Sequence, residues 1–413
     1  MNRWSAPVNG HPLQQQRARA AAAGSDYHVG MMTLNALVRG MVCALLLVCA
    51  PAETLAQETQ LSQTDVFVSG EGGYNTYRIP AAVVTNNGTV LAFCEGRRNG
   101  RSDTGDIDIL LRRSDDNGKT WSDTQVVWDD KGNTCGNPCP VVDRETGTIW
   151  LLLTWNSGTR AEGKTQAGFG TDSRRVFVTH SEDDGATWAE PVNITSQTKD
   201  EAWSWYATGP GAGIQIQRGD HAGRLVIPCD HKRPTEGAEL YASHVIYSDD
   251  HGKTWLLGGS SPRDQVNECE VVELEDGRLM LNMRNYDKSV RARQVCISND
   301  GGMTWEDQRH DPVLVESTCQ ASLRRLRWAK GDKPGVILFS NPASTTKREK
   351  LTVRASTDDG QTWGHSRLLY AGGSAYSCLS ILRDGTIACF FEKDNYKTIT
   401  FATFPLGWVH GSN

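Results

Sequence analysis

The sequence lacks any excess of positive charge. Its 413 residues contain 43 Lys and Arg against 49 Asp and Glu, which gives a formal net charge of −6 at pH 7. No stripe of basic residues reverses this balance. A general attraction to nucleic acid is therefore excluded, and no nucleic-acid partner is expected.

Motifs for metal and phosphate chemistry are also missing. The ten histidines form no HExxH pattern, and Cys135 and Cys139 have no second cysteine pair to complete a zinc site. The glycine-rich stretch after residue 205 lacks the Lys-Ser/Thr ending of a phosphate-binding loop. We therefore expect no metal and no organic cofactor.

Long apolar runs are absent, and the one short run lies near the N-terminus. Residues 41–50 read MVCALLLVCA, with Arg39 before them and PAETLAQ after them. A basic flank, an apolar core of about ten residues and small residues before a cleavage site are typical of a secretory signal. We expect residues 1–56 to be an N-terminal extension and signal peptide cleaved near Ala56. A signal anchor that stays in the bilayer is the alternative, and the Val before Cys49 makes a lipoprotein site a poor match.

Cysteine is too irregularly spaced to form a disulfide framework. Nine cysteines follow the leader, an odd number, and several lie inside apolar strand-like runs. Small buried hydrophobic side chains explain this pattern better than a set of bridges does. At most one or two disulfides are expected.

What the chain does contain is a repeated octapeptide, Ser-x-Asp-x-Gly-x-Thr-Trp. Asp hydrogen-bonds nearby backbone N–H groups, Gly tolerates positive φ, and Trp can pack beneath a turn, so each copy predicts a hairpin turn. We call these copies Asp-box turns. They begin 50 to 67 residues apart, at Ser114, Ser181, Ser248, Ser298 and Ser356.

This spacing fits a four-stranded sheet with one variable loop, and so predicts a β-propeller. Hydrophobic residues make up 38% of the chain and charged residues 22%, with 41 Gly and 13 Trp, as many short strands and turns require. Residues 57–413 are long enough for six four-stranded antiparallel blades in one catalytic domain. The turns themselves are interpreted as scaffold that does not touch a substrate.

Arg78 is the first residue that the repeats do not explain, because it opens an inward strand, where an unpaired charge is costly. With Tyr77-Arg78-Ile79-Pro80 ahead of the five Asp-box turns, the chain from about Gly70 to Glu392 resembles the sialidases, or exo-α-neuraminidases, of the bacterial secreted type. The resemblance implies a six-bladed propeller with three arginines around the carboxylate of sialic acid.

By their motif context, these arginines are Arg78, Arg284 in LNMRNYD and Arg348 in STTKREKL, the last with the loosest match because Lys347 and Lys350 are adjacent. Guanidinium groups bind a carboxylate through paired hydrogen bonds and stay charged at any working pH. Three of them would select an acidic sugar.

The resemblance also implies a loop aspartate that protonates the departing glycosidic oxygen, and Asp103 fits that position. Asp106 and Asp108 are alternatives, but the alternation of IDIL places them at the start of a strand. A general acid at neutral pH needs a raised pKa. Arg97 in the same loop is expected to face the sugar.

Tyr376 in GGSAYSCLSIL is the nucleophile that the resemblance implies, with Glu268 as its base. A phenol attacks poorly unless a carboxylate takes its proton. Tyrosine also suits a substrate whose own carboxylate would repel an attacking Asp or Glu, and sialidases are a recognised exception to the two-carboxylate rule. Glu270 and Glu273 compete with Glu268, because a regular strand puts Glu268 and Glu270 on the same face.

Supporting roles follow from the same resemblance. Glu392 is expected to brace the first arginine, and Glu95 is a second candidate. Trp203 and Trp205 could form an apolar wall for the N-acetyl group. His231 and His244 are interpreted as structural or exposed.

Together these residues predict a retaining exo-α-sialidase that acts on sialylated glycoproteins, glycolipids or oligosaccharides through a covalent sialosyl-tyrosine. We expect a monomer that is secreted or periplasmic, with association at the cell surface as an alternative, and with no membrane span in the mature chain. Three alternatives stay open: a trans-sialidase, a glycosidase for a related nonulosonic acid, and a non-catalytic propeller that binds sialylated glycans.

Overall fold

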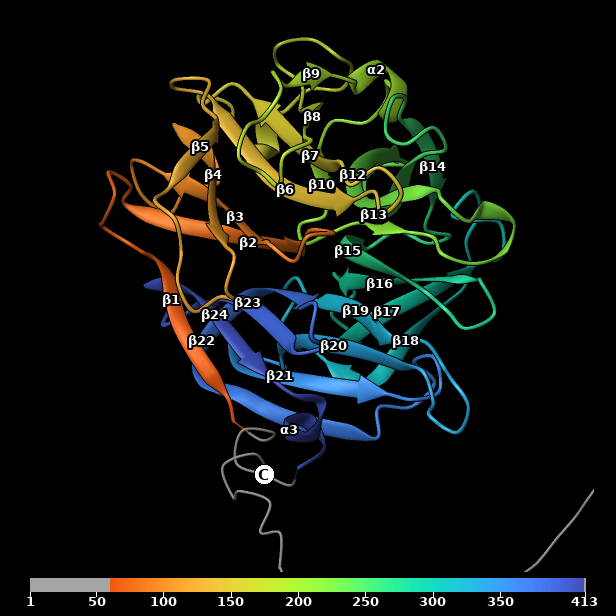
Figure 1. Cartoon of the computed structure of the whole chain (residues 1–413). Helices are drawn as coiled ribbons and strands as arrows, with labels where there is room; N and C mark the ends of the chain where they lie inside the picture. The colour runs from red at the N-terminus through yellow and green to blue at the C-terminus, as the bar shows by residue number, and fades with distance from the viewer. Residues whose placement is uncertain (1–59, 412–413) are drawn as a thin grey trace, which may run out of the picture. The chain divides into compact units, whose positions relative to one another are not determined.

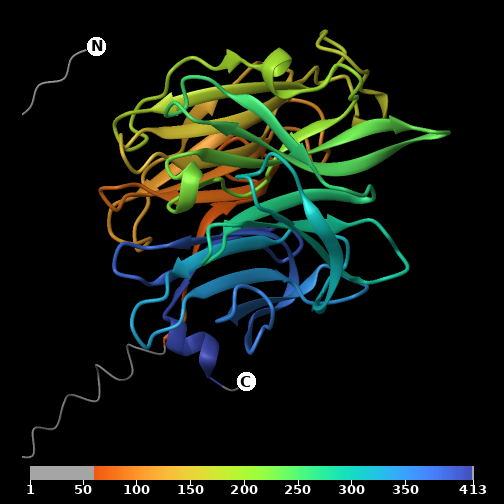
Figure 2. The same ribbon diagram turned by 90° about the vertical axis from the view of Figure 1, so that its right-hand side faces the viewer.

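Antiparallel β-strands make up nearly all of the regular secondary structure, in a computed structural model that describes residues 60–411 (Figures 1 and 2). The predicted all-β class is confirmed. The expected signal peptide, residues 1–56, lies outside the described residues. Within residues 60–411, no helix has the length and apolar character needed to cross a membrane.

The first hydrogen-bonded sheet has eight strands in the order β2-β3-β4-β6-β7-β8-β9, with β5 paired to β4. One parallel pair, Ile107 with Thr134, joins β4 to β6, so the sheet consists of two four-stranded sets. Its strands are β2 (Thr76–Val84), β3 (Val90–Arg97), β4 (Ile107–Ser114), β5 (Gln125–Trp128), β6 (Thr134–Val142), β7 (Ile149–Asn156), β8 (Arg175–Ser181) and β9 (Val192–Asn193).

Two smaller sheets follow along the chain. One has the order β10-β12-β13-β14 with β11 paired to β12, and the other has the order β15-β16-β17-β18. Their strands are β10 (Tyr206–Thr208), β11 (Ile214–Gln215), β12 (Leu225–Thr235), β13 (Ala238–Ser248), β14 (Leu256–Ser260), β15 (Val266–Glu273), β16 (Leu279–Asn285), β17 (Ala292–Ser298) and β18 (Glu306–Val315).

The last sheet joins the first described strand to the C-terminal strands, in the order β1-β24-β23-β22-β21-β20-β19. Its 17-residue strand β22 pairs with β21 through its first half and with β23 through its second half. The strands are β1 (Ser62–Val68), β19 (Ser322–Arg327), β20 (Val336–Pro342), β21 (Glu349–Ser356), β22 (His365–Ile381), β23 (Ile387–Lys393) and β24 (Thr398–Phe404). Four short helices complete the fold: η1 (Glu162–Lys164), α2 (Thr195–Thr198), η2 (Gly219–His221) and α3 (Leu406–His410).

The first strands of several sets are buried along nearly their whole length, and some of the last strands are exposed. Strand β15 is buried at all eight positions and β2 at eight of nine, whereas β9 is exposed at both of its positions. The first strands therefore form the interior, and the polar side chains on them must find partners there.

The Asp-box turns are hairpin turns, as predicted. In the first, the Gly118 N–H donates to Ser114 Oγ at 2.8 Å and the Thr120 N–H donates to Asp116 Oδ1 at 2.9 Å. Asn117 and Gly118 both have positive φ, 63° and 84°. The same four-residue network recurs in the other four copies, each between the third and fourth strands of a set.

The nine described cysteines are all buried and free, so no disulfide exists within residues 60–411. The expectation of small buried hydrophobic side chains is confirmed. Cys135 and Cys139 lie in β6 with side chains that contact the hydrophobic core.

Four interior strands carry a one-residue bulge near the same end. In β2, β6, β15 and β22, two residues oppose one on the neighbouring strand, between Arg78/Ala81, Gly136/Cys139, Val266/Cys269 and Ser374/Ser377. A bulge redirects side chains that a regular strand would keep on alternate faces. These bulges lie where the predicted catalytic residues are.

Candidate active site

One cavity of about 170 Å³ gathers the predicted site residues. Bulge residues contribute Ile79, Asn137, Asn267, Glu268 and Tyr376 to its wall. Eight of the nine predicted site residues line it: Arg78, Glu95, Arg97, Asp103, Glu268, Arg284, Arg348 and Tyr376. The ninth, Glu392, lies directly behind Arg78.

Tyr376 and Glu268 form a hydrogen-bonded pair. The Tyr376 hydroxyl donates to Glu268 Oε1, and Arg284 Nη1 lies 2.6 Å from Glu268 Oε2 and 3.2 Å from the Tyr376 hydroxyl oxygen. Burial and the charge of Glu268 hold the pKa of Tyr376 well above its ordinary value. The phenol is therefore protonated at rest, with a carboxylate in place to accept its proton.

Three guanidinium groups surround the Tyr376 ring. Those of Arg78 and Arg348 lie 5.2 and 5.6 Å from its centroid, and Arg284 contacts its hydroxyl. Arg348 donates to the Tyr396 hydroxyl at 3.2 Å and the Thr318 carbonyl at 3.4 Å, so its described partners are neutral. This part of the cavity therefore favours an anion.

Glu392 ties two interior strands together. It is fully buried and accepts hydrogen bonds from Arg78 Nε at 2.6 Å, the Ile79 N–H at 3.0 Å and the Tyr376 N–H at 3.0 Å. Ile79 has φ of 61°, an unfavourable conformation for a β-branched residue. Burial alone would lower the pKa of Arg78, but Glu392 and Tyr376 raise it above its ordinary value. The carboxylate thus fixes Arg78 and holds the backbone at Ile79 and Tyr376.

Asp103 lies at the rim of the cavity with a side chain that is 70% exposed. Arg97 Nη1 lies 2.6 Å from its Oδ1, and Arg78 Nη1 lies 3.9 Å away. Burial opposes the effect, but Arg97 and Arg78 hold the pKa of Asp103 below its ordinary value. This direction is opposite to the one expected of a general acid, because two guanidinium groups lie beside the carboxyl group.

The alternatives to Asp103 lie outside the cavity. Arg98 pairs with Asp108 at 2.7 Å and with Asp106 at 3.3 Å, and the Tyr74 hydroxyl also donates to Asp108. Burial raises the pKa of Asp108 to about 6. Of these three aspartates, Asp103 is therefore the one that lines the cavity.

The alternatives to Glu268 are likewise directed elsewhere. Glu270 is fully buried and accepts hydrogen bonds from the Leu323 N–H at 2.7 Å and the Ser322 hydroxyl at 3.0 Å. Glu273 accepts from the backbone of residues 217 and 218. The bulge between Val266 and Cys269 breaks the regular alternation that would have left Glu268 and Glu270 equivalent.

The two tryptophans do not form the wall expected of them. Trp205 lines the cavity, but Trp203 is buried in the core, where it stacks on His231 with centroids 3.4 Å apart. His231 and His244 share a 2.9 Å hydrogen bond and are both fully buried. Burial lowers the pKa of both imidazoles, so the structural interpretation of these histidines is confirmed.

Sequence reasoning missed a polar group on the same wall. Asp230 is fully buried, with its Oδ2 2.8 Å from Asn267 Nδ2 and 3.2 Å from Trp205 Nε1. The buried guanidinium of Arg174 lies 4.4 Å from the Trp205 ring, and burial lowers the pKa of Arg174 to about 10. An Asp inside the apolar run LVIPCDH was the available signal for the first, whereas nothing distinguished Arg174 from Arg175.

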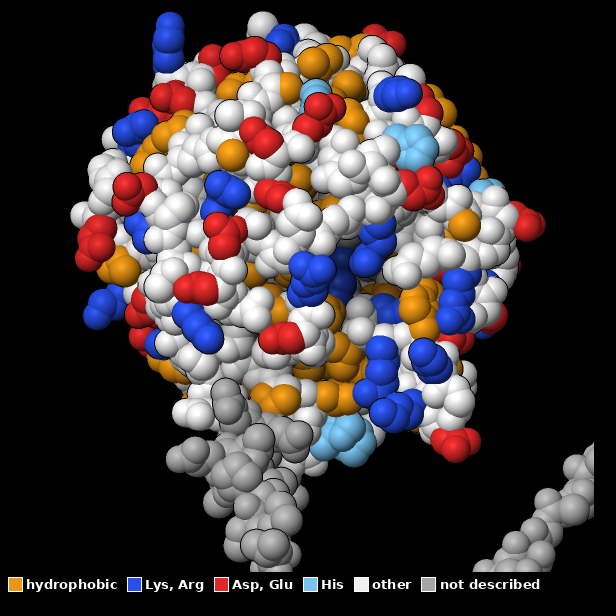
Figure 3. All heavy atoms as spheres, viewed as in Figure 1, with side chains coloured by type: hydrophobic (Ala, Val, Ile, Leu, Met, Phe, Trp, Pro, Cys, Tyr) orange, Lys and Arg blue, Asp and Glu red, His pale blue; other side chains and the backbone are white. Residues whose placement is uncertain are grey.

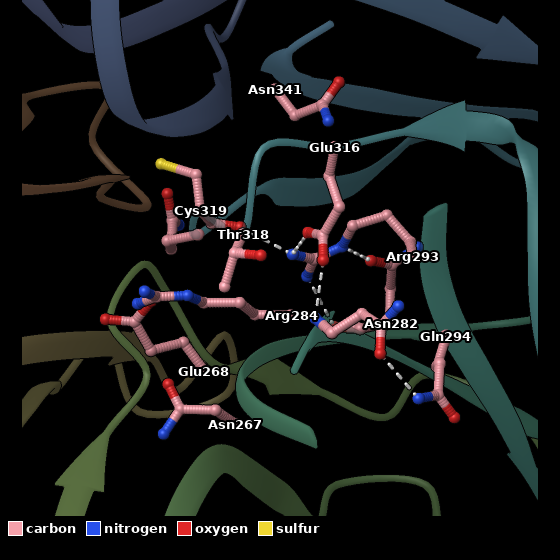
Figure 4. A network of polar contacts seen from close by, with 12 residues as sticks. Asn267, Glu268, Asn282, Arg284, Arg293, Gln294, Glu316, Thr318, Cys319 and Asn341 are labelled. Atoms are coloured by element: carbon pink, nitrogen blue, oxygen red, sulfur yellow. Dashed lines mark hydrogen bonds and ion pairs between the residues drawn. The ribbon is translucent and has the colours of Figure 1, made fainter. Parts of the chain in front are cut away.

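A second buried ion pair lies beside Arg284. Figure 4 shows Arg284 extending toward Glu268, next to Arg293 and Glu316. Arg293 Nη1 lies 2.8 Å from Glu316 Oε2 and donates to the Cys319 carbonyl at 2.7 Å. Glu316 Oε1 accepts the Asn285 N–H at 2.7 Å, so the pair holds the end of β16 just after Arg284.

Comparison with known proteins gives one consistent family. The BNR repeat-like domain matches residues 88–389. The exo-alpha-sialidase of Aspergillus fumigatus is 31% identical over 82% of this chain and 86% of its own length. The chain belongs to the sialidase family.

Other members of the sialidase family extend beyond the matched region. The sialidase of Micromonospora viridifaciens is 35% identical over 91% of this chain but only 59% of its own length. The structure of Hadza microbial sialidase Hz136 superposes with a TM-score of 0.77 and 34% identity, over 84% of this chain and 69% of that one. The chain thus spans about three fifths of the Micromonospora relative and has the all-β fold of solved sialidases.

Proposed function

We propose that this chain is a retaining exo-α-sialidase that hydrolyses terminal α-linked sialic acid from glycoproteins, glycolipids or oligosaccharides. The observation that carries the proposal is the Tyr376–Glu268 pair beneath three guanidinium groups. The similarity to an exo-alpha-sialidase over 82% of this chain and 86% of that protein supports it.

In the first step, Arg78, Arg284 and Arg348 bind the substrate carboxylate. The Tyr376 oxygen attacks the anomeric carbon as its proton passes to Glu268, and the bond to the glycosidic oxygen breaks. Asp103 donates a proton to that oxygen, so the aglycone leaves as a neutral alcohol.

In the second step, Asp103 removes a proton from water, whose oxygen attacks the anomeric carbon. The bond to Tyr376 breaks, and the phenol recovers its proton from Glu268. Two inversions at one carbon give net retention.

The proposal explains why the nucleophile is a tyrosine. Its high pKa keeps the phenol neutral when the anionic sugar arrives, so the substrate carboxylate meets no repulsion. Because Tyr376 and Glu268 share one proton, the pair carries a single negative charge until the Tyr376 oxygen bonds to the anomeric carbon, and Arg284 is placed to stabilise that charge.

We extend the proposal to the architecture. The strand pairings separate into six groups of neighbouring strands, which we assign as the six blades of a propeller. The groups are β2–β5; β6–β9; β10–β14; β15–β18; β19–β21 with the first half of β22; and the second half of β22 with β23, β24 and β1. Residues 57–413 would then be the catalytic domain of a monomer that is secreted or periplasmic after removal of residues 1–56.

Replacement of Tyr376 by Phe tests the function. Y376F should lose at least about 10³-fold in turnover of a fluorogenic sialoside, because the nucleophilic oxygen is gone, and should unfold at the same temperature as the parent. Tyr247→Phe is the matched control, since that ring contacts Arg224 away from the cavity. Full activity in Y376F would overturn the assignment. Proton NMR of the first product should show the α-anomer, and the β-anomer would overturn retention.

A further inference from the structure

A second, larger cavity lies at the opposite end of the interior strands. It has a volume of about 480 Å³ and shares no lining residue with the candidate active site. Strand β2 runs from Arg78 in one cavity to Val84 in the other, and β22 runs from Tyr376 to Ile381 in the same way. We call this second space the basal cavity.

The basal cavity opens on the face that carries helix α3. Ile381, which lines it, pairs with Ile387, and Ile387 pairs with Phe404, the residue that ends β24 shortly before α3. Figure 3 shows this face, with Lys and Arg side chains gathered around a central hollow and most acidic side chains farther out.

The lining carries a large excess of positive charge. Glu273 is the one carboxylate among its residues, and both of its oxygens already accept backbone N–H groups, at 2.7 and 2.8 Å. Five arginines line the same space: Arg144, Arg324, Arg325, Arg327 and Arg383. The carboxylates that line the cavity therefore neutralise little of its positive charge.

Most of these guanidinium groups have neutral partners. Arg324 donates to backbone carbonyls at 3.0 and 3.2 Å, Arg383 to the Asn87 carbonyl at 3.3 Å and Arg327 to the Pro334 carbonyl at 3.2 Å. Arg325 has ion pairs with Glu275 and Asp359 at 3.3 and 2.7 Å, and Arg324 Nη2 lies 3.8 Å from Glu270 Oε2. Partial desolvation within the cavity and the charge of Arg324 lower the pKa of Arg144.

One wall is aromatic and apolar. Trp328 lies under the guanidinium groups of Arg218 and Arg325, with 3.8 and 4.2 Å between ring centroid and carbon, and Val141 and Leu382 also line the cavity. Arginines that point into a concave space beside an apolar wall bind anions that carry a small organic body.

We propose that the basal cavity is a binding site for a small anion that bears a phosphate, sulfate or carboxylate group. Guanidinium groups bind such anions through paired, charge-assisted hydrogen bonds, and an anion would relieve the repulsion between Arg144 and Arg324. The cavity is within the usual size range of ligand pockets, roughly 300–1,000 Å³. The proposal is independent of the activity proposed above.

Isothermal titration of the full chain with inorganic phosphate and with glucose 6-phosphate, at low ionic strength, tests it. The parent should bind both saturably. The double variant Arg144→Gln/Arg383→Gln should weaken binding by about tenfold or more, because each arginine contributes a charge-assisted hydrogen bond. Both side chains are exposed, so the variant should fold.

The double variant Arg278→Gln/Arg309→Gln is the matched control, since it removes the same charge from exposed sites outside both cavities. It should bind within twofold of the parent. Tighter binding of glucose 6-phosphate, lost in Trp328→Ala, would support an organic anion, whereas equal binding of both probes would support a site that recognises the anionic group alone.

Three results would overturn the proposal. They are the absence of saturable binding by the parent, an unchanged affinity in the Arg144/Arg383 variant, and loss of binding in Arg348→Gln, which would place the anion in the candidate active site instead.

Discussion

Glu392 offers the sharpest test of how the cavity is held together. Its carboxylate is fully buried and accepts three N–H groups, from Arg78, Ile79 and Tyr376. Glu392→Gln keeps the size of the side chain but removes its charge and turns one acceptor oxygen into an N–H₂ donor. That amide must then face an N–H group, and Arg78 loses its nearest counter-charge.

The expected cost can be worked from these contacts. Removal of one partner of a buried ion pair costs about 3–5 kcal/mol, and the amide retains one acceptor, so E392Q should lower the free energy of unfolding by about 3 kcal/mol. Urea denaturation followed by tryptophan fluorescence measures this loss. Activity should fall as well, because the same carboxylate orients Arg78 and the backbone of Tyr376.

The matched control is Asp276→Asn, which removes an equal charge from an exposed pair with Arg278, with side chains 53% and 45% exposed. Exposed pairs contribute about 0–1 kcal/mol, so this variant should remain close to the parent. If E392Q and D276N are equally stable and equally active, Glu392 does not hold Arg78 and Tyr376 in place, and the reasoning is refuted.

Two further predictions concern carboxyl groups. Asp103→Asn should lose about 10²–10⁴-fold in the rate of hydrolysis of 3′-sialyllactose but far less with a methylumbelliferyl sialoside, whose phenol leaves without protonation. Equal losses with the two substrates would argue against a general acid. The control Asp106→Asn, outside the cavity, should keep both activities. Burial raises the pKa of Glu270 in the folded chain from 4.5 to about 7. Between these two pH values the folded chain retains a proton that the unfolded chain has released. The free energy of unfolding should therefore fall by about 3 kcal/mol as the pH rises from 4.5 to about 7. Glu270→Gln should flatten that fall in urea titrations at pH 4.5 to 7, whereas exposed Glu145→Gln should not; the same slope in E270Q as in the parent would show that Glu270 does not cause it.

The all-β class and the turns could be predicted from the sequence because their causes are local. Asp116, Gly118 and Thr120 form their hydrogen bonds within one octapeptide, so the motif carries its own geometry. The pairing of β1 with β24 has no such signal. Ser62 and Thr403 are partners across most of the chain, and only the assembled fold brings them together.

The site was predicted less completely, for a physical reason. Arg78 could be found because a charged residue was unexpected in an inward strand, whereas Glu268 and Tyr376 followed from the resemblance to the sialidases. The directions in which these side chains point could not be predicted, because a bulge changes which face of the strand a side chain occupies. The sequence of a bulge differs little from that of a regular strand. Trp203 illustrates the limit: its neighbour Trp205 reaches the cavity, whereas Trp203 stacks on His231 in the core.

The lowered pKa of Asp103 bears on how the acid arises. Arg97 and Arg78 favour the ionised carboxylate of Asp103, which is the wrong state for a proton donor. A substrate carboxylate bound to Arg78 neutralises one of these cations and brings a negative charge toward Asp103. Both changes raise the pKa of Asp103, and the ligand also excludes water from a side chain that is 70% exposed without it. Asp103 would then become a proton donor only when an anionic sugar is bound to the arginines. A neutral sugar of the same size would therefore bind poorly, and its leaving group would also not be protonated.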